Sequence, residues 1–112
     1  MSISTHILDT ATGRPATQVP VTLSIEKDGL WSDLFVTSTD QDGRCNQLLP
    51  DSQGFLAGTY RIHFDTAAYY ATQNLHGLYP FVDITFTVTN TTQHYHIPLL
   101  LTPNSYTTYR GS

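Results

Sequence analysis

The chain has 112 residues, and its five Lys and Arg against nine Asp and Glu give a net charge of -4 at pH 7 with His neutral. A chain of this length is expected to form one domain, here residues 1–112, around a single hydrophobic core. The scarcity of basic residues excludes the charge pattern of a nucleic-acid-binding protein. The hydrophobic fraction of 39% argues against intrinsic disorder.

No segment approaches the roughly 20 apolar residues that span a bilayer, so no membrane partner is expected. The first residues lack the pattern of a signal peptide. The single cysteine, Cys45, excludes an internal disulfide framework. These features predict a cytoplasmic protein, with a periplasmic or peroxisomal location expected only if a precursor segment is missing.

The first third of the chain predicts a hairpin followed by a turn. Residues 19–26 alternate apolar and polar side chains, a period of two that is typical of a half-buried strand. The Asp-Gly pair at 28–29 predicts a tight turn, and residues 30–37 form the second strand. The turn-forming residues 40–43 then place Arg44 directly after a turn.

The middle of the chain predicts two more strands and one helix. Residues 58–65 and 82–89 alternate apolar and polar side chains, so each is expected to form a strand. Between them, Thr66 stands before Ala-Ala-Tyr-Tyr-Ala. We expect Thr66 to be the N-cap of one short helix.

The last part of the chain predicts two further strands, at residues 93–101 and 105–110. Pro98 has no N–H for a sheet ladder, so it should lie at an edge, at a bulge or where no donor is required. With a first strand expected around His6, the chain has about seven to eight short strands and one helix, which predict an antiparallel β-sandwich. Sheet edges with few charges also predict edge-to-edge association into an oligomer.

Candidate chemistry lies at His6, Arg44, His94 and His96. Each His can be a polar residue on a solvated face. The His-x-His pair with His6 could instead present three imidazoles to zinc. In a third reading, a neutral imidazole activates water and a guanidinium stabilises developing negative charge, without a metal. Composition does not choose among these readings.

Motifs at both ends and in the centre resemble one known family. They are Ser4-Thr5-His6-Ile7-Leu8-Asp9, Gly13-Arg14-Pro15-Ala16, Thr39-Asp40-Gln41-Asp42-Gly43-Arg44, Tyr95-His96-Ile97-Pro98-Leu99-Leu100-Leu101 and Tyr109-Arg110-Gly111-Ser112. Together they resemble the transthyretin-like 5-hydroxyisourate hydrolases over the whole chain. The closing tetrapeptide is the most specific motif, because the hormone-carrying transthyretins continue there with small and apolar residues. Those carriers also have Lys where His6 stands.

The resemblance implies a transthyretin-like sandwich that assembles as a homotetramer, a dimer of dimers, with active sites at a subunit interface in a central channel. It implies hydrolysis of 5-hydroxyisourate, the product of urate oxidation, to 2-oxo-4-hydroxy-4-carboxy-5-ureidoimidazoline. This step of purine catabolism is expected to need no cofactor and no metal.

Carried over residue by residue, the resemblance assigns catalytic roles to His6, Arg44, His96 and Ser112, and substrate binding to Tyr109, Arg110 and Gly111. We favour His6 as the group that polarises water. His96 then orients the water or protonates the leaving nitrogen. The planar, permanently charged fork of Arg44 suits a substrate carbonyl.

The roles of three further residues, Ser112, Arg110 and His94, are left open by the sequence. Ser112 offers a hydroxyl and the α-carboxylate together, so a C-terminal extension is expected to disturb the site. Arg110 anchors the tail or contacts substrate. His94 shares a face with His96 and could support it.

Two alternatives to the hydrolase are kept. One is a transthyretin-like binding protein whose channel holds an aromatic ligand without turning it over. Such a carrier would keep ligand binding after His6→Ala, whereas a hydrolase would lose its rate and keep its fold. The weaker alternative is a zinc site built from His6, His94 and His96.

Overall fold

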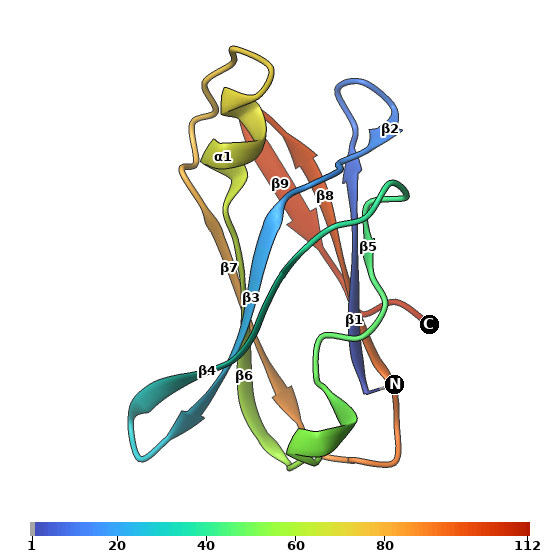
Figure 1. Ribbon diagram of the computed structural model, residues 1–112, viewed down its shortest axis with the longest axis vertical. Coiled ribbons are helices and arrows are strands. Elements are labelled where there is room, and N and C mark those ends of the chain that lie inside the picture. Colours follow the sequence, from blue (N-terminus) through green and yellow to red (C-terminus); the bar gives the residue numbers. More distant parts are fainter. Residues whose placement is uncertain (1) are drawn as a thin grey trace.

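The computed structural model describes residues 2–112. Two β-sheets pack face to face, and one short helix lies at one end of the sandwich (Figure 1). This arrangement confirms the predicted β-sandwich with one helix. Among residues 2–112, no helix is long and apolar enough to cross a membrane.

The chain forms nine strands, one α-helix and one 3₁₀ helix within residues 2–112. They are β1 (Ile3–Asp9), β2 (Arg14–Pro15), β3 (Pro20–Lys27), β4 (Leu30–Ser38), β5 (Arg44–Cys45), the 3₁₀ helix η1 (Asp51–Gln53), β6 (Gly58–Phe64), α1 (Thr66–Ala71), β7 (Val82–Val88), β8 (Tyr95–Thr102) and β9 (Ser105–Thr108).

One sheet has the strand order β2-β1-β8-β9, and β5 also pairs with β1. The β1–β8 pair joins the two ends of the chain and is parallel, whereas the other pairs of this sheet are antiparallel. Its register sets Ser4 opposite His96 and His6 opposite Pro98. The parallel pairing therefore brings the motifs from both ends of the sequence onto one sheet.

The other sheet has the order β4-β3-β6-β7, with every pair antiparallel. A register shift between Leu23 and Ser24 interrupts the pairing of β3 with β4. The strands β7 and β9 each end their sheet at one edge, and β4 and β2 end the two sheets at the other.

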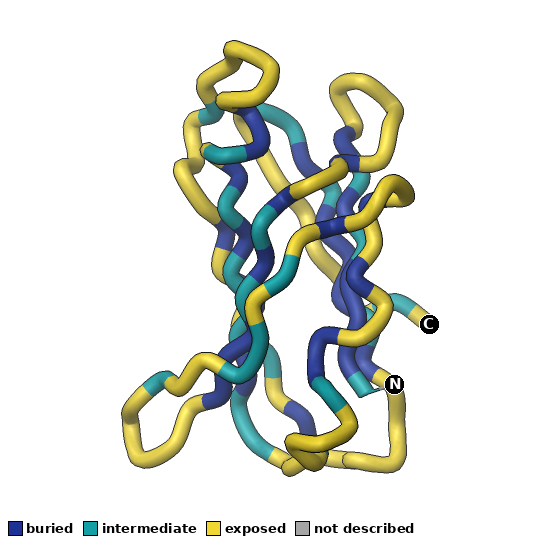
Figure 2. Tube along the Cα trace, in the orientation of Figure 1, coloured by how far each residue is buried: buried dark blue, intermediate teal, exposed yellow. Residues whose placement is uncertain are grey.

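The core lies between the sheets and is built from alternate residues of the strands. Figure 2 shows this as buried stretches along the strands and exposed loops at both ends. The largest fully buried side chains include Tyr60, Phe64, Ile3, Ile7 and Leu99. Burying each such apolar side chain stabilises the fold by roughly 1.5–3 kcal/mol. Because the core uses one face of each sheet, the opposite faces remain available for other contacts.

The helix begins one residue earlier than predicted. Asp65, not Thr66, is the N-cap of α1, and its Oδ1 accepts the N–H of Ala68 at 3.0 Å. The Thr66 hydroxyl instead donates to the carbonyl oxygen of Tyr79 at 2.9 Å. The expected cap was wrong because Thr66 is fully buried and bonds to the segment that leads into β7. Asp65, a better capping residue than Thr, lies just beyond β6, although the alternating pattern predicted it as the last residue of that strand.

Two predicted strands are displaced or shortened. The strand expected over 93–101 is Tyr95–Thr102, and the strand expected over 105–110 ends at Thr108. Pro98 lies in an interior strand, but pairing of β8 with β9 stops at Leu99. Pro98 therefore occupies a position where β9 requires no N–H from it. The chain after Thr108 turns away from the ladder and forms the C-terminal tail.

Candidate functional site

The candidate site lies on the side of the β1–β8 sheet that faces away from the core. Strand alternation sends Ile3, Thr5 and Ile7 into the core, so Ser4 and His6 point to the other side. We call this side the outer face. His96 lies on it as well, because it is the register partner of Ser4.

A tight turn fixes Arg44 beside His6. The Asp40 carboxylate accepts the backbone N–H groups of Asp42 and Arg44, each at 2.9 Å. Gly43 has φ +72°, and a Cβ there would lie 2.6 Å from the carbonyl oxygen of Ile7. Only glycine allows the turn to approach β1 this closely.

Immediately after this turn, Arg44 pairs with His6 as a direct cross-strand neighbour. Direct partners in an antiparallel pair present their side chains on the same face. His6 and Arg44, to which the resemblance assigns catalytic roles, therefore share the outer face, with Arg44 exposed and Cys45 buried on the other side.

Burial and positive charge keep both imidazoles neutral. Partial burial and the adjacent Arg44 guanidinium lower the pKa of His6, against a hydrogen bond to the backbone of Asp42 and the charges of nearby Asp residues, which raise it. Burial also lowers the pKa of His96, and Arg44, His94 and His6 lower it further. A histidine whose pKa lies below its usual value of about 6.5 is a neutral acid or base at pH 7.

Ser4 joins two histidines on the outer face. Its Oγ lies 2.8 Å from Nε2 of His94 and 2.7 Å from Nδ1 of His96. The two rings are nearly parallel, at 16° with centroids 6.5 Å apart. No role was expected for Ser4 from the sequence, although alternation along β1 puts it on the same face as His6.

The C-terminal tail crosses over His96. The N–H of Gly111 donates to the carbonyl oxygen of His96 at 2.8 Å, which forms an isolated antiparallel bridge. A Cβ at position 111 would lie 2.5 Å from Cδ2 of His96. Gly111 thus allows the tail to lie directly against the imidazole.

The other tail residues are placed differently. The guanidinium of Arg110 lies 4.3 Å from the ring centroid of Tyr95 and donates to Oε1 of Gln93 at 3.1 Å. Tyr95 belongs to the core side of β8, so Arg110 is placed to anchor the tail, one of the two roles expected for it. Tyr109 and Ser112 are exposed.

The geometry does not assemble the alternative metal site. Among residues 2–112, no three His, Cys, Asp or Glu side chains gather closely enough to hold a metal ion. His94 and His96 direct nitrogens to the Ser4 hydroxyl between them.

The arrangement suits hydrolysis of a flat polar molecule. Two neutral imidazoles can take and give protons, and the permanently charged Arg44 can stabilise an oxyanion. The three side chains project from adjacent strands β5, β1 and β8. Their positions therefore depend on sheet register and not on a flexible loop.

Comparisons with known proteins identify the relatives of this chain. The HIUase/Transthyretin family matches residues 3–111. The mouse (Mus musculus) 5-hydroxyisourate hydrolase is 46% identical over 98% of this chain and 94% of its own length. The Klebsiella pneumoniae 5-hydroxyisourate hydrolase structure has a TM-score of 0.87 at 34% identity and covers 100% of both chains.

A second solved structure, sea bream transthyretin in complex with thyroxine, has a TM-score of 0.92 at 34% identity, over 99% of this chain and 95% of that one. The transthyretin-like fold predicted from the sequence is thus confirmed. The chain belongs to the HIUase/Transthyretin family.

Proposed function

We propose that this chain hydrolyses 5-hydroxyisourate to 2-oxo-4-hydroxy-4-carboxy-5-ureidoimidazoline in urate degradation, without a metal or cofactor. The observation that carries this proposal is the placement of His6, Arg44 and His96 on one face, with both imidazole pKa values lowered. The name of the mouse relative, 46% identical over nearly the whole chain, supports the same activity.

The proposed roles follow from the chemistry of each group. His6 takes a proton from the attacking water, and Arg44 stabilises the oxyanion that forms on the attacked carbonyl. As the C–N bond breaks, its electron pair goes to the ring nitrogen, which takes a proton from His96. The tail, with Gly111 against the His96 ring, limits where the flat substrate can lie. We also propose that the exposed tail residues Tyr109 and Ser112 contact substrate when a second subunit covers the site.

We further propose that the protein assembles as a homotetramer, a dimer of dimers, with the outer faces lining a shared channel. The outer face of one subunit is a sheet surface, and Arg44 on it is exposed. A second outer face packed opposite would exclude bulk water, which strengthens the electrostatic contribution of Arg44.

A carrier function is the second candidate, and the match to sea bream transthyretin favours it as far as the fold is concerned. The two solved relatives have the same 34% identity to this chain, so these two structures do not separate the two functions, whereas the mouse relative, 46% identical, is named a hydrolase. The group of two neutral imidazoles and Arg44 favours the hydrolase, since holding an aromatic ligand requires no proton transfer.

The test is the ultraviolet absorbance decay of 5-hydroxyisourate, generated in place from urate by urate oxidase, with and without untagged protein. We expect strong acceleration over the spontaneous decay at catalytic protein concentration. His6→Ala should lower kcat by about 10²- to 10⁴-fold, since it removes the proposed base. Arg44→Ala should cost about 10²- to 10³-fold.

The control is His63→Ala in the other sheet, where the imidazole pairs with Asp83 at 2.6 Å. This variant should keep the wild-type rate. Decay that matches the blank with folded wild-type protein, together with binding of an aromatic ligand that survives His6→Ala, would establish the carrier instead.

A further inference from the structure

The Ser4 hydroxyl occupies an unusual position between His96 of β8 and His94, which lies just before that strand. It is 5% exposed, and its Oγ lies within 2.8 Å of ring nitrogens of both His94 and His96. The parallel register of β1 with β8 sets Ser4 opposite His96. These two ring nitrogens are the hydrogen-bond partners that the structure gives to Ser4 Oγ within residues 2–112.

The single hydroxyl proton of Ser4 limits how the hydrogen bonds between His94, Ser4 and His96 can be arranged. A hydroxyl has one proton to donate and two lone pairs to accept with. A buried hydroxyl proton is stabilised by donation, and the acceptors within reach are the two ring nitrogens. One ring therefore accepts from Ser4 while the other donates to it, so the tautomers of His94 and His96 are coupled.

We propose that Ser4 and His94 form a proton relay that resupplies His96 during turnover, an inference that rests on the proposed hydrolase function. In the resting state, His94 Nε2–H donates to Ser4 Oγ, and Ser4 Oγ–H donates to His96 Nδ1. This leaves His96 with its proton on Nε2, available to a substrate on the outer face. Ser4 and His94 are positioning residues that act through His96.

The relay step balances and leaves Ser4, His94 and His96 uncharged, while His6 carries the proton that it took from water. His96 Nε2 gives its proton to the leaving nitrogen, which receives the electron pair of the C–N bond. Ser4 then passes its proton to His96 Nδ1, takes the Nε2 proton of His94, and His94 takes a proton from solvent at Nδ1. The reverse movement restores the resting state when His96 Nε2 takes up the proton that His6 removed from water.

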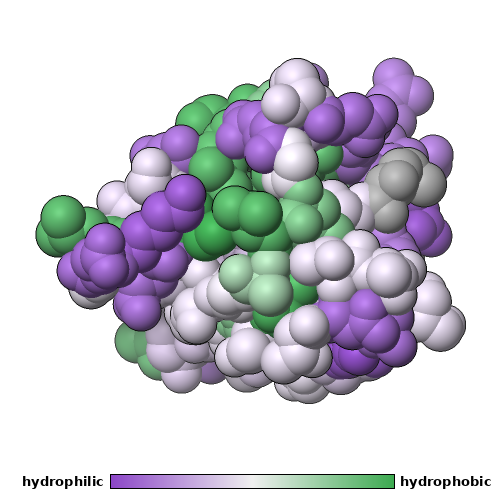
Figure 3. All heavy atoms as spheres, turned by 90° about the horizontal axis from the view of Figure 1, so that it is seen from below, coloured by the Kyte–Doolittle hydropathy of each residue, from purple (hydrophilic) through white to green (hydrophobic). Residues whose placement is uncertain are grey.

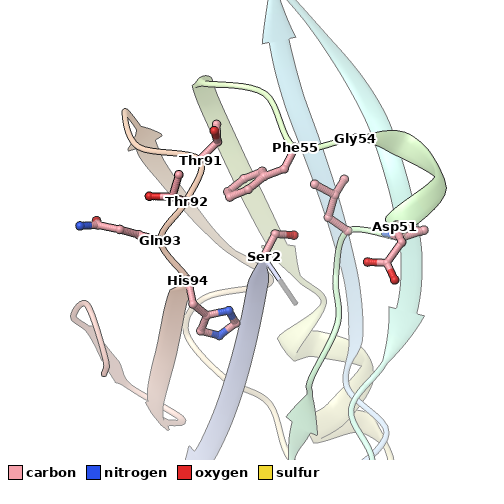
Figure 4. A pocket seen from close by; sticks show the side chains of 10 residues that line it. Ser2, Asp51, Gly54, Phe55, Thr91, Thr92, Gln93 and His94 are labelled. Carbon is pink, nitrogen blue, oxygen red and sulfur yellow. The ribbon is translucent and has the colours of Figure 1, made fainter.

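The surroundings favour a relay with its outer end at His94. His94 is exposed and lines a cavity of about 330 Å³ between the start of β1, the η1 segment and the β7–β8 loop. In Figure 4, the His94 ring lies beside the first residues of β1, with Thr92 and Gln93 of the loop next to it. A proton can therefore enter from this cavity and reach His96 without crossing the part of the outer face that holds Arg44.

The groups around His96 also favour a relay that keeps its ring neutral. Arg44, His94 and His6 all disfavour a positive charge on the His96 ring. A relay that keeps His96 neutral throughout removes this cost. Direct protonation of His96 by solvent would place a cation among these three groups.

The experiment measures kcat, KM and the response to added imidazole for Ser4→Ala, His94→Gln, the double variant and Ser4→Thr. We expect either single change to lower kcat by about 10- to 100-fold with little change in KM, less than the ~10⁴-fold upper range for losing an acid–base group outright. The double variant should be no slower than the slower single variant, since both break one chain. Ser4→Thr keeps the hydroxyl and should retain most of the rate.

Imidazole buffer gives the readout that a purely structural role would not change. Added imidazole should raise the rate of Ser4→Ala and of His94→Gln and leave the wild type unaffected, because a small acid can replace the missing relay. Ser24→Ala and His63→Gln are matched controls in the other sheet, where Ser24 bonds to Asp33 and His63 to Asp83. Both should match the wild type with and without imidazole.

Other results would overturn the relay. One such result is a wild-type kcat in both Ser4→Ala and His94→Gln. Another is a Ser4→Ala variant that is slow and does not respond to imidazole, together with a His94→Gln variant that has the wild-type kcat. Nitrogen NMR of labelled histidines tests the hydrogen-bond chain without any substrate: His96 should be the Nε2–H tautomer in the wild type and a mixture in Ser4→Ala. An inactive wild type with these NMR results would overturn the proposed function while retaining the chain of contacts.

Discussion

At the scale of residues, the lowered pKa values of His6 and His96 predict the pH dependence of the site. Burial and Arg44 lower both values below about 6.5, so kcat/KM should be level at neutral pH and fall as pH drops through the lowered values. Arg44→Gln should raise the pKa of both imidazoles. His94→Gln should raise that of His96 and leave that of His6, because His94 lowers only the former.

NMR titration of the histidine ring signals measures these shifts directly. Equal pKa shifts of His6 and His96 in His94→Gln would contradict the inference that His94 lowers the pKa of His96 alone. The same two groups also affect stability: the unfolded chain binds their protons at higher pH than the folded chain does. Their contribution to the free energy of unfolding is therefore present above pH 6.5 and is lost as pH falls through the lowered pKa values.

A buried pair of side chains ties the end of β1 to the helix. The Tyr69 hydroxyl donates to Oδ2 of Asp9 at 2.7 Å, and Asp9 is 1% exposed. Burial, with the Asp9 carboxylate, raises the pKa of Tyr69 to about 12, so it remains a donor. Tyr69→Phe leaves a buried carboxylate oxygen without this bond and should lower the free energy of unfolding by about 1.5–3 kcal/mol.

Urea unfolding followed by fluorescence or circular dichroism measures this loss. Tyr79→Phe, an exposed tyrosine whose ring contact with Tyr106 is unchanged by the substitution, is the control and should stay within about 0.5 kcal/mol of the wild type. A Tyr69→Phe variant as stable as this control would show that water replaces the lost donor.

At the scale of elements, local patterns could predict the strands but not how the ends of the chain meet. Period-two alternation located β3, β6 and β7, because each has one face against the core. The parallel β1–β8 pair could not be derived from alternation, since pairing between strands some 90 residues apart leaves no local signal. The contact of Ser4 with His94 and His96 depends on that register and was missed for the same reason.

The C-terminal tail also shows that local patterns do not predict long-range contacts. Residues 105–110 have strand-forming side chains throughout, yet β9 ends at Thr108. The tail then leaves the sheet, and Gly111 forms a β-bridge with His96. This long-range contact outweighs the local strand propensity of the last residues. That His6, Arg44 and His96 belong together was implied by family resemblance. Their placement on one face agrees with that implication, while their catalytic roles stay predictions.

Substitution of Gly111 tests the role of this tail as an element. Gly111→Ala puts a Cβ 2.5 Å from the His96 ring, so the tail or the ring must move. Because residues 109–112 add no side chain to the core, the midpoint of thermal unfolding should stay within a few degrees of the wild type. The rate of 5-hydroxyisourate hydrolysis should fall at least about 10-fold, since small displacements of a catalytic group are costly.

Asn104→Ala, in the exposed β8–β9 turn, changes the same hairpin away from His96 and should keep the wild-type rate. A Gly111→Ala variant with full activity would show that the tail has no part in positioning His96.

At the scale of the whole molecule, exposed apolar side chains beside the edges of the sheets predict that the protein assembles into an oligomer. Apolar side chains are exposed in the α1–β7 connection and on β9 at Leu78, Tyr79, Phe81 and Tyr106. We call these four residues the apolar rim. The strands β7 and β9 end their sheets beside it, and β7 carries a single charge among its exposed side chains. Apolar surface beside unpaired strand edges is typical of subunit contacts.

Apolar surface is also visible elsewhere, at the lower end of the sandwich, between hydrophilic groups (Figure 3). Exposure of an apolar side chain alone therefore does not define an interface. Leu30, the first residue of β4, is 74% exposed, more than Phe81 at 49%, but it lies beside the turn at the end of the β3–β4 hairpin. The two residues thus form a matched pair for testing which surface takes part in assembly.

We expect Phe81→Asp to shift the protein from a tetramer to smaller species in light scattering coupled to size exclusion, because association would bury an unpaired carboxylate. Its specific activity should fall on dilution at concentrations where the wild type is still constant, since the proposed channel needs two outer faces. Leu30→Asp should keep both the wild-type mass and the wild-type rate. A monomeric wild type with full activity would show that one outer face suffices for catalysis, and the water-excluding role proposed for the second subunit would be wrong.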